Sequence, residues 1–302
     1  MKKRLSIFGC TGSIGETTLK LIKKENKEYS FYIFTAYKNY KKIKNLIQQY
    51  KPKIFIIFDY KIYLQVKKQY LKKNIKILNA NDYKSFNFKK SDVSILAIPG
   101  IAGLEPSLKA IKISKKILIA NKESVICGWD LINKSVKKYK VKLLPVDSEH
   151  FSVMNLIQET DKKYIDKIYL TASGGPFLNY PLNKLNKVKP HQAVKHPKWK
   201  MGKKISVDSA TLMNKIFEIV EANRLFSINF NKIDILIHPQ SLVHAVIKFK
   251  NGLYKFLYFE TDMSVPIGNA LFEEKFEIKK FAKKNNKLMK NDISENLRFL
   301  KV

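Results

Sequence analysis

Short apolar runs alternate with helix-like segments along the first half of the chain. Each run has four to six residues, mostly Ile, Val, Leu, Phe or Ala, which is a suitable length for a buried strand. We predict strands at 5–8, 31–36, 54–58, 93–98, 117–120 and 141–144, and intervening helices that include 16–24, 40–49 and 104–113. This alternation predicts an α/β fold with a Rossmann-like, doubly wound parallel sheet.

The pattern changes at about residue 151. A predicted strand at 167–171 leads to the turn Ser173-Gly174-Gly175-Pro176, then to a loop and a long helix near 210–226. Further strands are predicted at 233–237, 243–249 and 254–259. Strands and helices mixed in this way predict an α+β domain with a mixed sheet.

We therefore expect three parts of the chain. The Rossmann-like domain covers residues 1–146, and the α+β domain covers residues 147–272. Residues 273–302 are rich in Lys and Asn and poorly patterned, so we expect a basic tail or truncated linker there.

The net charge of +33 comes from Lys, because the only arginines among the 58 basic residues are Arg4, Arg224 and Arg298. Proteins that read nucleic acid favour Arg, whose planar guanidinium binds guanine and phosphate through paired hydrogen bonds. The Lys residues are spread along the whole chain. We therefore expect no nucleic-acid partner, although the charge would attract anionic substrates.

No apolar run reaches the length needed to cross a bilayer. The N-terminus is basic but passes directly into the first predicted strand, without the apolar core of a signal peptide. We therefore expect a cytoplasmic protein with no membrane partner.

The turn Gly9-Cys10-Thr11-Gly12-Ser13-Ile14-Gly15 follows the first predicted strand and begins a helix. Its glycines allow a tight turn and close backbone approach, and the N-terminus of a helix attracts a diphosphate. The spacing is G-x-x-G-x-x-G rather than G-x-G-x-x-G, so an ordinary strand-to-helix turn stays as the alternative.

The end of the second strand indicates which dinucleotide binds. NAD-binding folds usually place an acidic residue there to hold the ribose 2′-hydroxyl. This chain has Thr35-Ala36-Tyr37-Lys38-Asn39 instead, and Lys38 would attract a 2′-phosphate. We therefore predict NADPH.

Two carboxylates are close together in Pro145-Val146-Asp147-Ser148-Glu149-His150, which follows an apolar strand. If the strand continues, its period of two would point Asp147 and Glu149 to the same side. Like charges this close need a cation between them, and a hard divalent ion such as Mg²⁺ or Mn²⁺ would serve. The hexapeptide therefore predicts metal-assisted chemistry.

Three other segments carry candidate polar groups. Lys122 in Ala120-Asn121-Lys122-Glu123-Ser124 follows a buried strand, at the edge where open α/β sheets bind ligands, or it simply begins a helix. Within residues 209–218, Ser209 has the character of an N-cap, and Asn214, Lys215 and Glu218 would share one helix face. That face suits a phosphate, with Glu218 as a third acid, unless it is a solvated surface. The loop 196–202 could close over a ligand or pack on the surface.

Taken together, the motifs resemble the 1-deoxy-D-xylulose 5-phosphate reductoisomerase family of the non-mevalonate isoprenoid pathway. The matching segments are GCTGSIG at 9–15, ANKES at 120–124, PVDSEH at 145–150, SGGPF at 173–177, HPKWKMGKKISVDSATLMNK at 196–215 and HPQS at 238–241. They cover residues 1–270 in the family's order, so coincidence is a poor explanation.

The resemblance implies a role for each matching residue. Asp147, Glu149 and Glu218 would bind Mg²⁺ or Mn²⁺, with Co²⁺ as a further candidate, and together with Lys122 they would form the catalytic set. Lys122 and Ser148 would contact the substrate, a small phosphorylated sugar. Its phosphate end would contact Ser173, His196, Ser209, Asn214 and Lys215. NADPH would contact Thr11, Gly12, Ser13, Ile14, Lys38, Asn39, Asn121, Glu123 and Gly202. Trp199 and Met201 would lie on a mobile flap.

The implied reaction is a metal-dependent rearrangement of the substrate's carbon skeleton, followed by hydride transfer from NADPH, which gives 2-C-methyl-D-erythritol 4-phosphate. The resemblance also implies a homodimer formed through the strands at 243–249 and 254–259.

Two departures from the family pattern affect these expectations. Tyr37 replaces a usual Gly beside the predicted 2′-phosphate site. The family's C-terminal helical domain has no counterpart before Val302. The alternative is therefore an inactive or weakly active remnant that still binds nucleotide or a partner.

Overall fold

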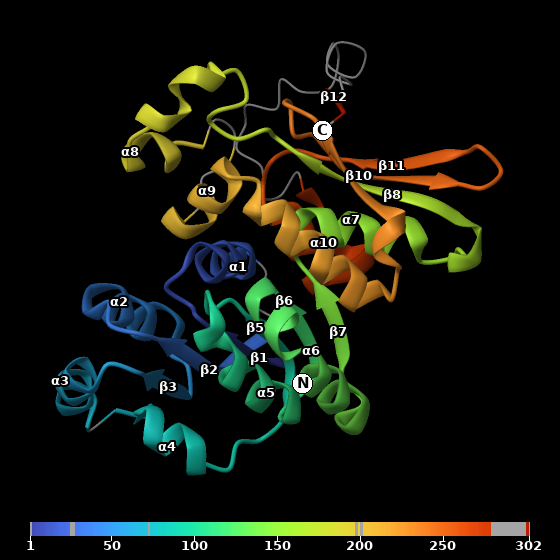
Figure 1. Cartoon of the computed structure of the whole chain (residues 1–302). Helices are drawn as coiled ribbons and strands as arrows, with labels where there is room; N and C mark the ends of the chain where they lie inside the picture. Colours follow the sequence, from blue (N-terminus) through green and yellow to red (C-terminus); the bar gives the residue numbers. More distant parts are fainter. Residues whose placement is uncertain are drawn as a thin grey trace. The chain divides into compact units, whose positions relative to one another are not determined.

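The computed structural model describes residues 2–24, 28–71, 73–196, 199, 202–278 and 300–301. The chain forms two compact units (Figure 1). The first comprises Met1–Pro145 and Ile267–Phe276, and the second comprises Val146–Pro266 and Glu277–Val302. Within the described ranges, no helix has both the length and the hydropathy needed to span a membrane.

A seven-stranded parallel sheet forms the centre of the first unit, with the order β4-β3-β2-β1-β5-β6-β7. Successive strands leave β1 in one direction and resume on its other side at β5, so the topological switch point lies between β1 and β5. Open α/β sheets bind ligands at such a point. The strands are β1 (Lys3–Phe8), β2 (Tyr29–Ala36), β3 (Ile54–Ile57), β4 (Lys76–Leu78), β5 (Ser91–Leu96), β6 (Ser114–Ile119) and β7 (Lys142–Pro145).

Helices connect these strands and cover the sheet (Figure 1). They are α1 (Ser13–Lys24), α2 (Tyr40–Tyr50), α3 (Tyr60–Tyr70), α4 (Ala80–Ser85), the 3₁₀ turn η1 (Ile101–Gly103), α5 (Leu104–Lys112) and α6 (Lys122–Tyr139). A later helix, α11 (Ser264–Phe272), returns to this unit, where the carbonyl of Leu271 accepts a hydrogen bond from the Tyr29 hydroxyl (3.3 Å).

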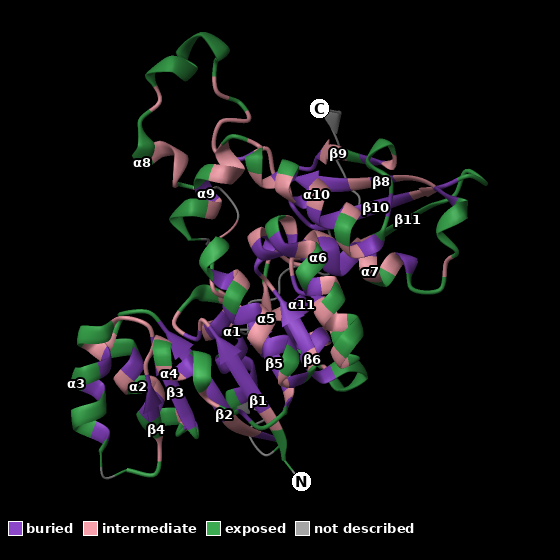
Figure 2. Cartoon of the chain, turned by 60° about the horizontal axis from the view of Figure 1, so that its bottom comes forward, coloured by how far each residue is buried: buried purple, intermediate pink, exposed green. Residues whose placement is uncertain are grey.

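Most residues of the inner strands β1, β2, β3 and β5 are buried (Figure 2). All four residues of β3 are buried, and the rings of Phe8, Phe34 and Phe55 have no exposed surface. Runs of apolar residues, rather than alternation of apolar and polar ones, are typical of a parallel sheet covered by helices.

The second unit contains a five-stranded mixed sheet with the order β11-β10-β8-β9-β12. Strand β8 pairs parallel with β9 and antiparallel with β10. Helices α7 and α10 pack against the sheet, and Val153, Leu170 and Ala222 are fully buried in the core that they share. The strands are β8 (Ile165–Ala172), β9 (Ile233–Ile237), β10 (Val243–Phe249), β11 (Tyr254–Tyr258) and β12 (Leu300–Lys301).

Among the helical segments described in the second unit, α7 with 10 residues and α10 with 14 residues are the longest. The segments are α7 (Ser148–Ile157), η2 (Lys162–Tyr164), η3 (Leu182–Lys187), α8 (Pro190–Ala193), α9 (Lys203–Ala210), α10 (Met213–Phe226) and η4 (Phe230–Lys232). A further 3₁₀ turn, η5 (Glu273–Lys275), belongs to the part of the chain that returns to the first unit. The Lys- and Asn-rich segment 279–299 lies outside the described residues.

The predicted fold class is confirmed, and two details differ. The pattern does not predict β4, which has only three residues. The helix predicted near 210–226 is confirmed as α10, but it begins at Met213, and a separate helix, α9, ends at Ala210. Leu212 lies between them with φ of 58°, a left-handed conformation that a continuous helix cannot contain.

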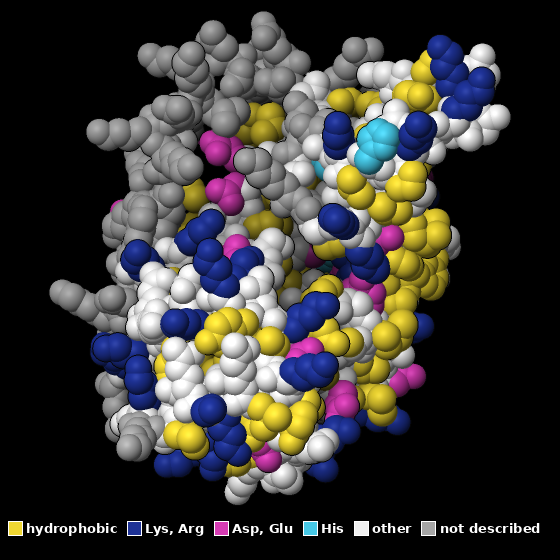
Figure 3. Space-filling view, turned by 90° about the vertical axis from the view of Figure 1, so that its left-hand side faces the viewer, with side chains coloured by type: hydrophobic (Ala, Val, Ile, Leu, Met, Phe, Trp, Pro, Cys, Tyr) yellow, Lys and Arg dark blue, Asp and Glu magenta, His cyan; other side chains and the backbone are white. Residues whose placement is uncertain are grey.

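Lys and Arg side chains are scattered over the face drawn in Figure 3, among apolar and acidic ones. They form no single basic patch on that face. This distribution agrees with the even spread of Lys along the sequence.

Candidate functional site

Close backbone packing shapes the turn between β1 and α1. Gly9 has φ of +91°, and a Cβ on it would lie 2.6 Å from the carbonyl oxygen of Ala97. A Cβ on Gly15 would lie 2.6 Å from both the Cα of Cys10 and the carbonyl oxygen of Gly9. Only glycine fits these two positions without moving backbone. The residues predicted to bind NADPH here, Thr11, Gly12, Ser13 and Ile14, therefore lie in a fixed turn whose helix N-terminus suits a diphosphate.

Two other residues predicted to bind the cofactor, Lys38 and Asn39, are exposed directly after β2. The side-chain oxygen of Asn39 caps α2 by accepting the backbone N–H of Lys42 (3.1 Å). The ammonium of Lys42 donates to the carbonyl of Thr11 (3.1 Å) and pairs with Glu16. Lys42 is therefore a cation beside the turn that the sequence analysis missed, because only the fold brings the start of α2 to the start of α1.

The ANKES segment begins α6. Asn121 is the N-cap, and the predicted substrate ligand Lys122 is buried in the first helical turn beside the half-buried Glu123. This arrangement combines both interpretations of the segment, since it begins a helix and also lies after β6 at the carboxyl edge of the sheet. The roles of Lys122 and Glu123 stay predictions.

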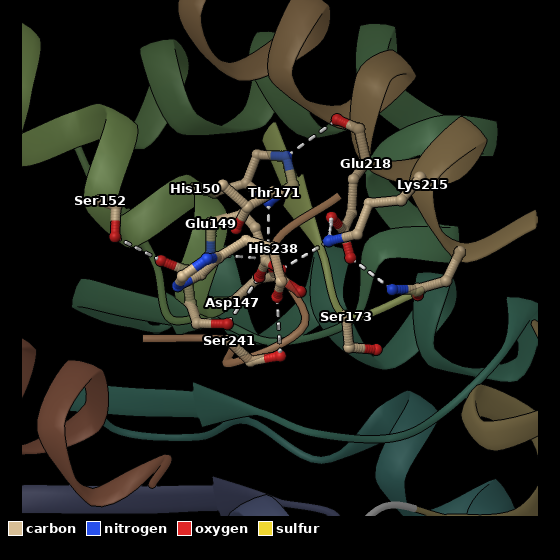
Figure 4. Close-up of polar contacts among 12 residues, drawn as sticks. Asp147, Glu149, His150, Ser152, Thr171, Ser173, Lys215, Glu218, His238 and Ser241 are labelled. Carbon is tan, nitrogen blue, oxygen red and sulfur yellow. Dashed lines mark hydrogen bonds and ion pairs between the residues drawn. The ribbon is translucent and has the colours of Figure 1, made fainter. Parts of the chain in front are cut away.

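Three carboxylates converge in the second unit (Figure 4). Asp147, Glu149 and Glu218 each offer one oxygen, and these oxygens lie within 4.8 Å of one another. Glu218 is almost completely buried, while Asp147 and Glu149 are half-buried. Carboxylate oxygens at this spacing match the ligands that Mg²⁺ and Mn²⁺ prefer.

The prediction that strand alternation brings Asp147 and Glu149 to the same side is nevertheless wrong. The strand β7 ends at Pro145, and Asp147 is the N-cap of α7, where it accepts the backbone N–H of Glu149 (3.3 Å). The two carboxylates therefore converge through a helix start rather than through strand alternation. Ser148 lies between them and donates its hydroxyl to Glu149 (2.5 Å).

The ammonium of Lys215 lies among these carboxylates. Its Nζ is 2.5 Å from an oxygen of Glu149 and 2.5 Å from an oxygen of Glu218. Burial alone would lower the pKa of Lys215, but Glu149 and Glu218 favour the charged form and raise it above its ordinary value. The cluster thus already stabilises a buried positive charge, as a cation site must.

A second group shares Asp147. The Nδ1 of the fully buried His150 lies 3.0 Å from Asp147 and 3.4 Å from Glu221, and its Nε2 donates to the carbonyl of Glu218 (2.9 Å). Burial opposes the charged ring, but Glu221 and Asp147 outweigh it and raise the pKa of His150 to about 9. The site analysis from sequence missed His150, although its i+3 spacing from Asp147 on a helix was a usable signal.

Two residues predicted to hold phosphate are hydrogen-bonded to each other. The Nδ1 of His196 accepts the backbone N–H of Trp199 (2.8 Å), so in the neutral ring the Nε2 carries the proton and donates to the Ser173 hydroxyl oxygen (2.9 Å). Burial, and then the charge of Lys215, lower the pKa of His196 and favour this neutral ring. The Ser173 oxygen also accepts the N–H of Gly175 (3.1 Å), which leaves its own proton to donate.

The interpretation of Ser209 as an N-cap is wrong, because Ser209 lies in the last turn of α9. It still lies beside the Ser173 turn, since a Cβ on Gly175 would be 2.9 Å from the carbonyl oxygen of Ser209. Asn214, Lys215 and Glu218 do share one turn of α10, as predicted, but Asn214 and Lys215 are both directed at Glu218.

Of the two predicted flap residues, Trp199 is half-buried and packs edge-on against His244, with ring centroids 5.9 Å apart. Met201 lies outside the described residues. Gly202, predicted to contact the cofactor, is the exposed N-cap of α9.

A parallel sheet with a glycine-dependent turn at its switch point is typical of dinucleotide-binding enzymes, and the second unit adds a carboxylate cluster that could hold a metal ion. Two family models match the chain. One, described as 1-deoxy-D-xylulose 5-phosphate reductoisomerase, matches residues 5–128, and its C-terminal domain model matches residues 143–226. The chain belongs to the 1-deoxy-D-xylulose 5-phosphate reductoisomerase family.

Individual relatives agree with this assignment. The 1-deoxy-D-xylulose 5-phosphate reductoisomerase of Pelagibacter ubique is 48% identical over 275 residues, which cover 89% of this chain and 70% of the relative. A crystal structure of DOX-P reductoisomerase in complex with NADPH, fosmidomycin and magnesium has a TM-score of 0.85 at 32% identity, with 99% of this chain and 75% of that chain covered. The Zymomonas mobilis enzyme in complex with NADPH has a TM-score of 0.82 at 33% identity, with coverages of 93% and 75%.

Proposed function

We propose that this protein converts 1-deoxy-D-xylulose 5-phosphate into 2-C-methyl-D-erythritol 4-phosphate, using NADPH and a divalent metal ion. The observation that carries the proposal is the convergence of Asp147, Glu149 and Glu218 within 4.8 Å. Family membership supplies the reaction class, and the structures of relatives with NADPH and with magnesium support the choice of cofactors.

The residues present fit a divalent cation. Asp147, Glu149 and Glu218 would hold it, because their hard carboxylate oxygens lie close together and two of them, Glu149 and Glu218, already stabilise the positive charge of Lys215. A cation bound there would supply Lewis-acid stabilisation of the negative charge that develops on the substrate oxygens. Mg²⁺ and Mn²⁺ are both suitable, with Co²⁺ as a third candidate.

The chain's own residues would bind and orient the sugar phosphate. The free proton of the Ser173 hydroxyl can be donated to a phosphate oxygen, and the neighbouring His196 fixes the position of that hydroxyl. Lys215, Asn214 and Ser209 are the further phosphate contacts that we propose, and Lys122 and Ser148 would contact the rest of the substrate. Fixing the phosphate end holds the reacting carbons in position, so binding energy from a remote group lowers the barrier.

In the first unit, the fixed turn at Gly9–Gly15 would bind the diphosphate of NADPH, and Lys38 would attract its 2′-phosphate. We further propose a homodimer formed at the β11 edge of the second sheet. The aromatic rings of Tyr254 and Phe256 are exposed on that edge strand, and an exposed edge strand favours pairing with another copy. Size-exclusion chromatography with light scattering would test the dimer, and a cytoplasmic location remains our expectation.

The reaction itself is tested by following NADPH oxidation at 340 nm with this 302-residue chain. We expect oxidation only when the sugar phosphate and Mg²⁺ or Mn²⁺ are both present, with no signal when either is omitted or when EDTA is added. Folded protein that binds NADPH but shows no oxidation in the complete mixture would favour the alternative, an inactive remnant that retains nucleotide binding.

A further inference from the structure

The side chain of Asn121 is fully engaged inside the first unit. Its amide nitrogen donates one hydrogen to the carbonyl of Ile98 and the other to the carbonyl of Gly100 (2.9 Å). Its oxygen accepts the backbone N–H of Ser124 (2.5 Å), which caps α6. Asn121 is buried, so both amide hydrogens are committed to one loop rather than to solvent.

That loop, residues 97–103, includes η1 and connects β5 to α5. Gly100 has φ of +71°, and a Cβ on Gly103 would lie 2.7 Å from the Asn121 amide nitrogen and 2.6 Å from the Ile98 carbonyl oxygen. Gly103 therefore leaves the space that the amide of Asn121 occupies. The Asn121 side chain holds the loop together, because the carbonyls of Ile98 and Gly100, which would otherwise repel one another, both accept hydrogens from its amide nitrogen.

The same loop forms one wall of the Gly9–Gly15 turn. The N–H of Ala97 donates to the carbonyl of Phe8 (2.8 Å), immediately before Gly9. A Cβ on Gly9 would lie 2.6 Å from the Ala97 oxygen and 2.9 Å from the Ile98 nitrogen. A shift of Ile98 would therefore be transmitted directly to Gly9.

We propose that Asn121 is a positioning residue for the dinucleotide site, which acts by holding loop 97–103 against the Gly9–Gly15 turn and not by a hydrogen bond to NADPH from its amide nitrogen. The inference rests on the proposed function, since it assumes that the first unit binds NADPH. Gly103 takes part in the same positioning, because the amide of Asn121 needs the room that Gly103 provides.

Substitution can separate two roles of Asn121: the cap, which is its bond to Ser124, and the brace, which is its pair of bonds to loop 97–103. Asp and Ser both cap helices well, so Asn121→Asp and Asn121→Ser retain the bond to Ser124. The Asp carboxylate donates nothing to the loop, and the single hydroxyl of Ser can replace at most one of the two donated bonds. Gly103→Ala disturbs the same contact from the loop side, because its methyl group would crowd the amide of Asn121, while residue 121 itself is unchanged. Asn79→Ser is the matched control, because Asn79 caps α4 beside the edge strand β4 and donates to no loop.

The test is a fluorescence titration of the 302-residue chain with NADPH, accompanied by steady-state kinetics. We expect Asn121→Asp, Asn121→Ser and Gly103→Ala each to raise the Kd for NADPH by about tenfold or more, since each leaves buried carbonyls unpaired or displaced. We expect the KM for NADPH to rise in step with the Kd and the affinity for Mn²⁺ to stay close to wild type, which a general loss of folding would not allow. Asn79→Ser should bind NADPH like the wild type.

Combining Asn121→Ser with Gly103→Ala should weaken binding little more than either change alone, because both act on one brace. Wild-type affinity for NADPH in Asn121→Ser would overturn the inference. Weaker binding in Asn121→Ser together with normal binding in Gly103→Ala would also overturn it, because that result indicates a direct contact between Asn121 and NADPH. Absence of NADPH binding by the wild type would instead contradict the proposed function, so the two failures are distinguishable.

Discussion

In the first unit, Gly9 and Gly15 leave no room for a side chain, and the turn they form is defined by backbone atoms only a few ångströms apart. In the second unit, Asp147, Glu149 and Glu218 meet through side chains from two helices, around the ammonium of Lys215. The first region depends on shape and the second on charge. An added methyl group should therefore be most harmful in the first region, whereas a neutralised charge should be most harmful in the second.

The largest expected effect is the loss of one carboxylate. Glu218→Gln keeps the shape of the side chain but removes the charge of a ligand that is almost completely buried. We expect metal-dependent turnover to fall by about a thousandfold and Mn²⁺ binding, followed by electron paramagnetic resonance, to weaken strongly. NADPH binding should be retained. Turnover close to wild type would show that Glu218 is not a metal ligand.

The corresponding change in the first unit adds one methyl group. Gly15→Ala would place a Cβ 2.6 Å from the backbone of Gly9 and Cys10, so the turn must open. We expect the Kd for NADPH to rise by at least about thirtyfold while Mn²⁺ affinity is unchanged. Gly252→Ala tests for a general effect of replacing glycine, because Gly252 has φ of +85° but no atom within 4 Å of its Cβ position. Normal NADPH affinity in Gly15→Ala would mean that the turn does not shape the cofactor site.

Lys215 sharpens the charge side of the comparison, because it and a divalent ion need the same two carboxylates. Lys215→Met removes the competing ammonium, so we expect Mn²⁺ to bind about tenfold more tightly. Because Lys215 is also a proposed phosphate contact, the kcat/KM for the sugar phosphate should fall at the same time. Lys248→Met, which breaks a surface pair with Asp166, is the control. Weaker Mn²⁺ binding in Lys215→Met would contradict this competition.

The smallest effect concerns stability and pH. Burial lowers the pKa of His244 to about 4, although its hydrogen bond to the Phe259 carbonyl opposes the shift. The unfolded state therefore takes up a proton below about pH 6.5 that the folded state takes up only near pH 4. The contribution of His244 to the free energy of unfolding is fully present above about pH 6.5, and it is lost progressively as the pH falls toward the pKa of the folded state.

Chemical denaturation at two pH values measures this contribution. Between about pH 7 and about pH 5.5, His244 should account for a loss of about 1 kcal/mol in the free energy of unfolding. In His244→Gln that part of the pH dependence should disappear. An unchanged pH profile in His244→Gln would show that His244 is not the group responsible.

The glycine turn and the carboxylate cluster also differ in how far the sequence alone predicts them. The glycine motif spans only seven residues, so the local pattern predicts both its place and its glycines, although the contacts of Gly9 with Ala97 and Ile98 come from a distant segment. The strands at 233–237 and 243–249 match β9 and β10 residue for residue, because an apolar run bounded by polar residues is a local signal.

The carboxylate cluster could be predicted only in part. The pattern correctly selects Asp147, Glu149 and Glu218, but it assigns a strand where the chain begins α7. Ser209 is likewise assigned to the start of the long helix but lies at the end of α9, because a left-handed Leu212 separates α9 from α10. Asn121, Lys42 and the pairing of Lys215 with Glu149 depend on segments far apart in the sequence, and no local pattern reports such contacts.

The central claim is that Asp147, Glu149 and Glu218 bind the catalytic cation. Anomalous diffraction from crystals soaked in Mn²⁺ tests it directly, because the ion can be located independently of activity. We predict one strong peak about 2.1 Å from an oxygen of each of the three carboxylates, with the Lys215 ammonium moved away from it. A peak among Asp147, His150 and Glu221, which also lie within 4.8 Å of one another, or no peak in this unit, would contradict the account.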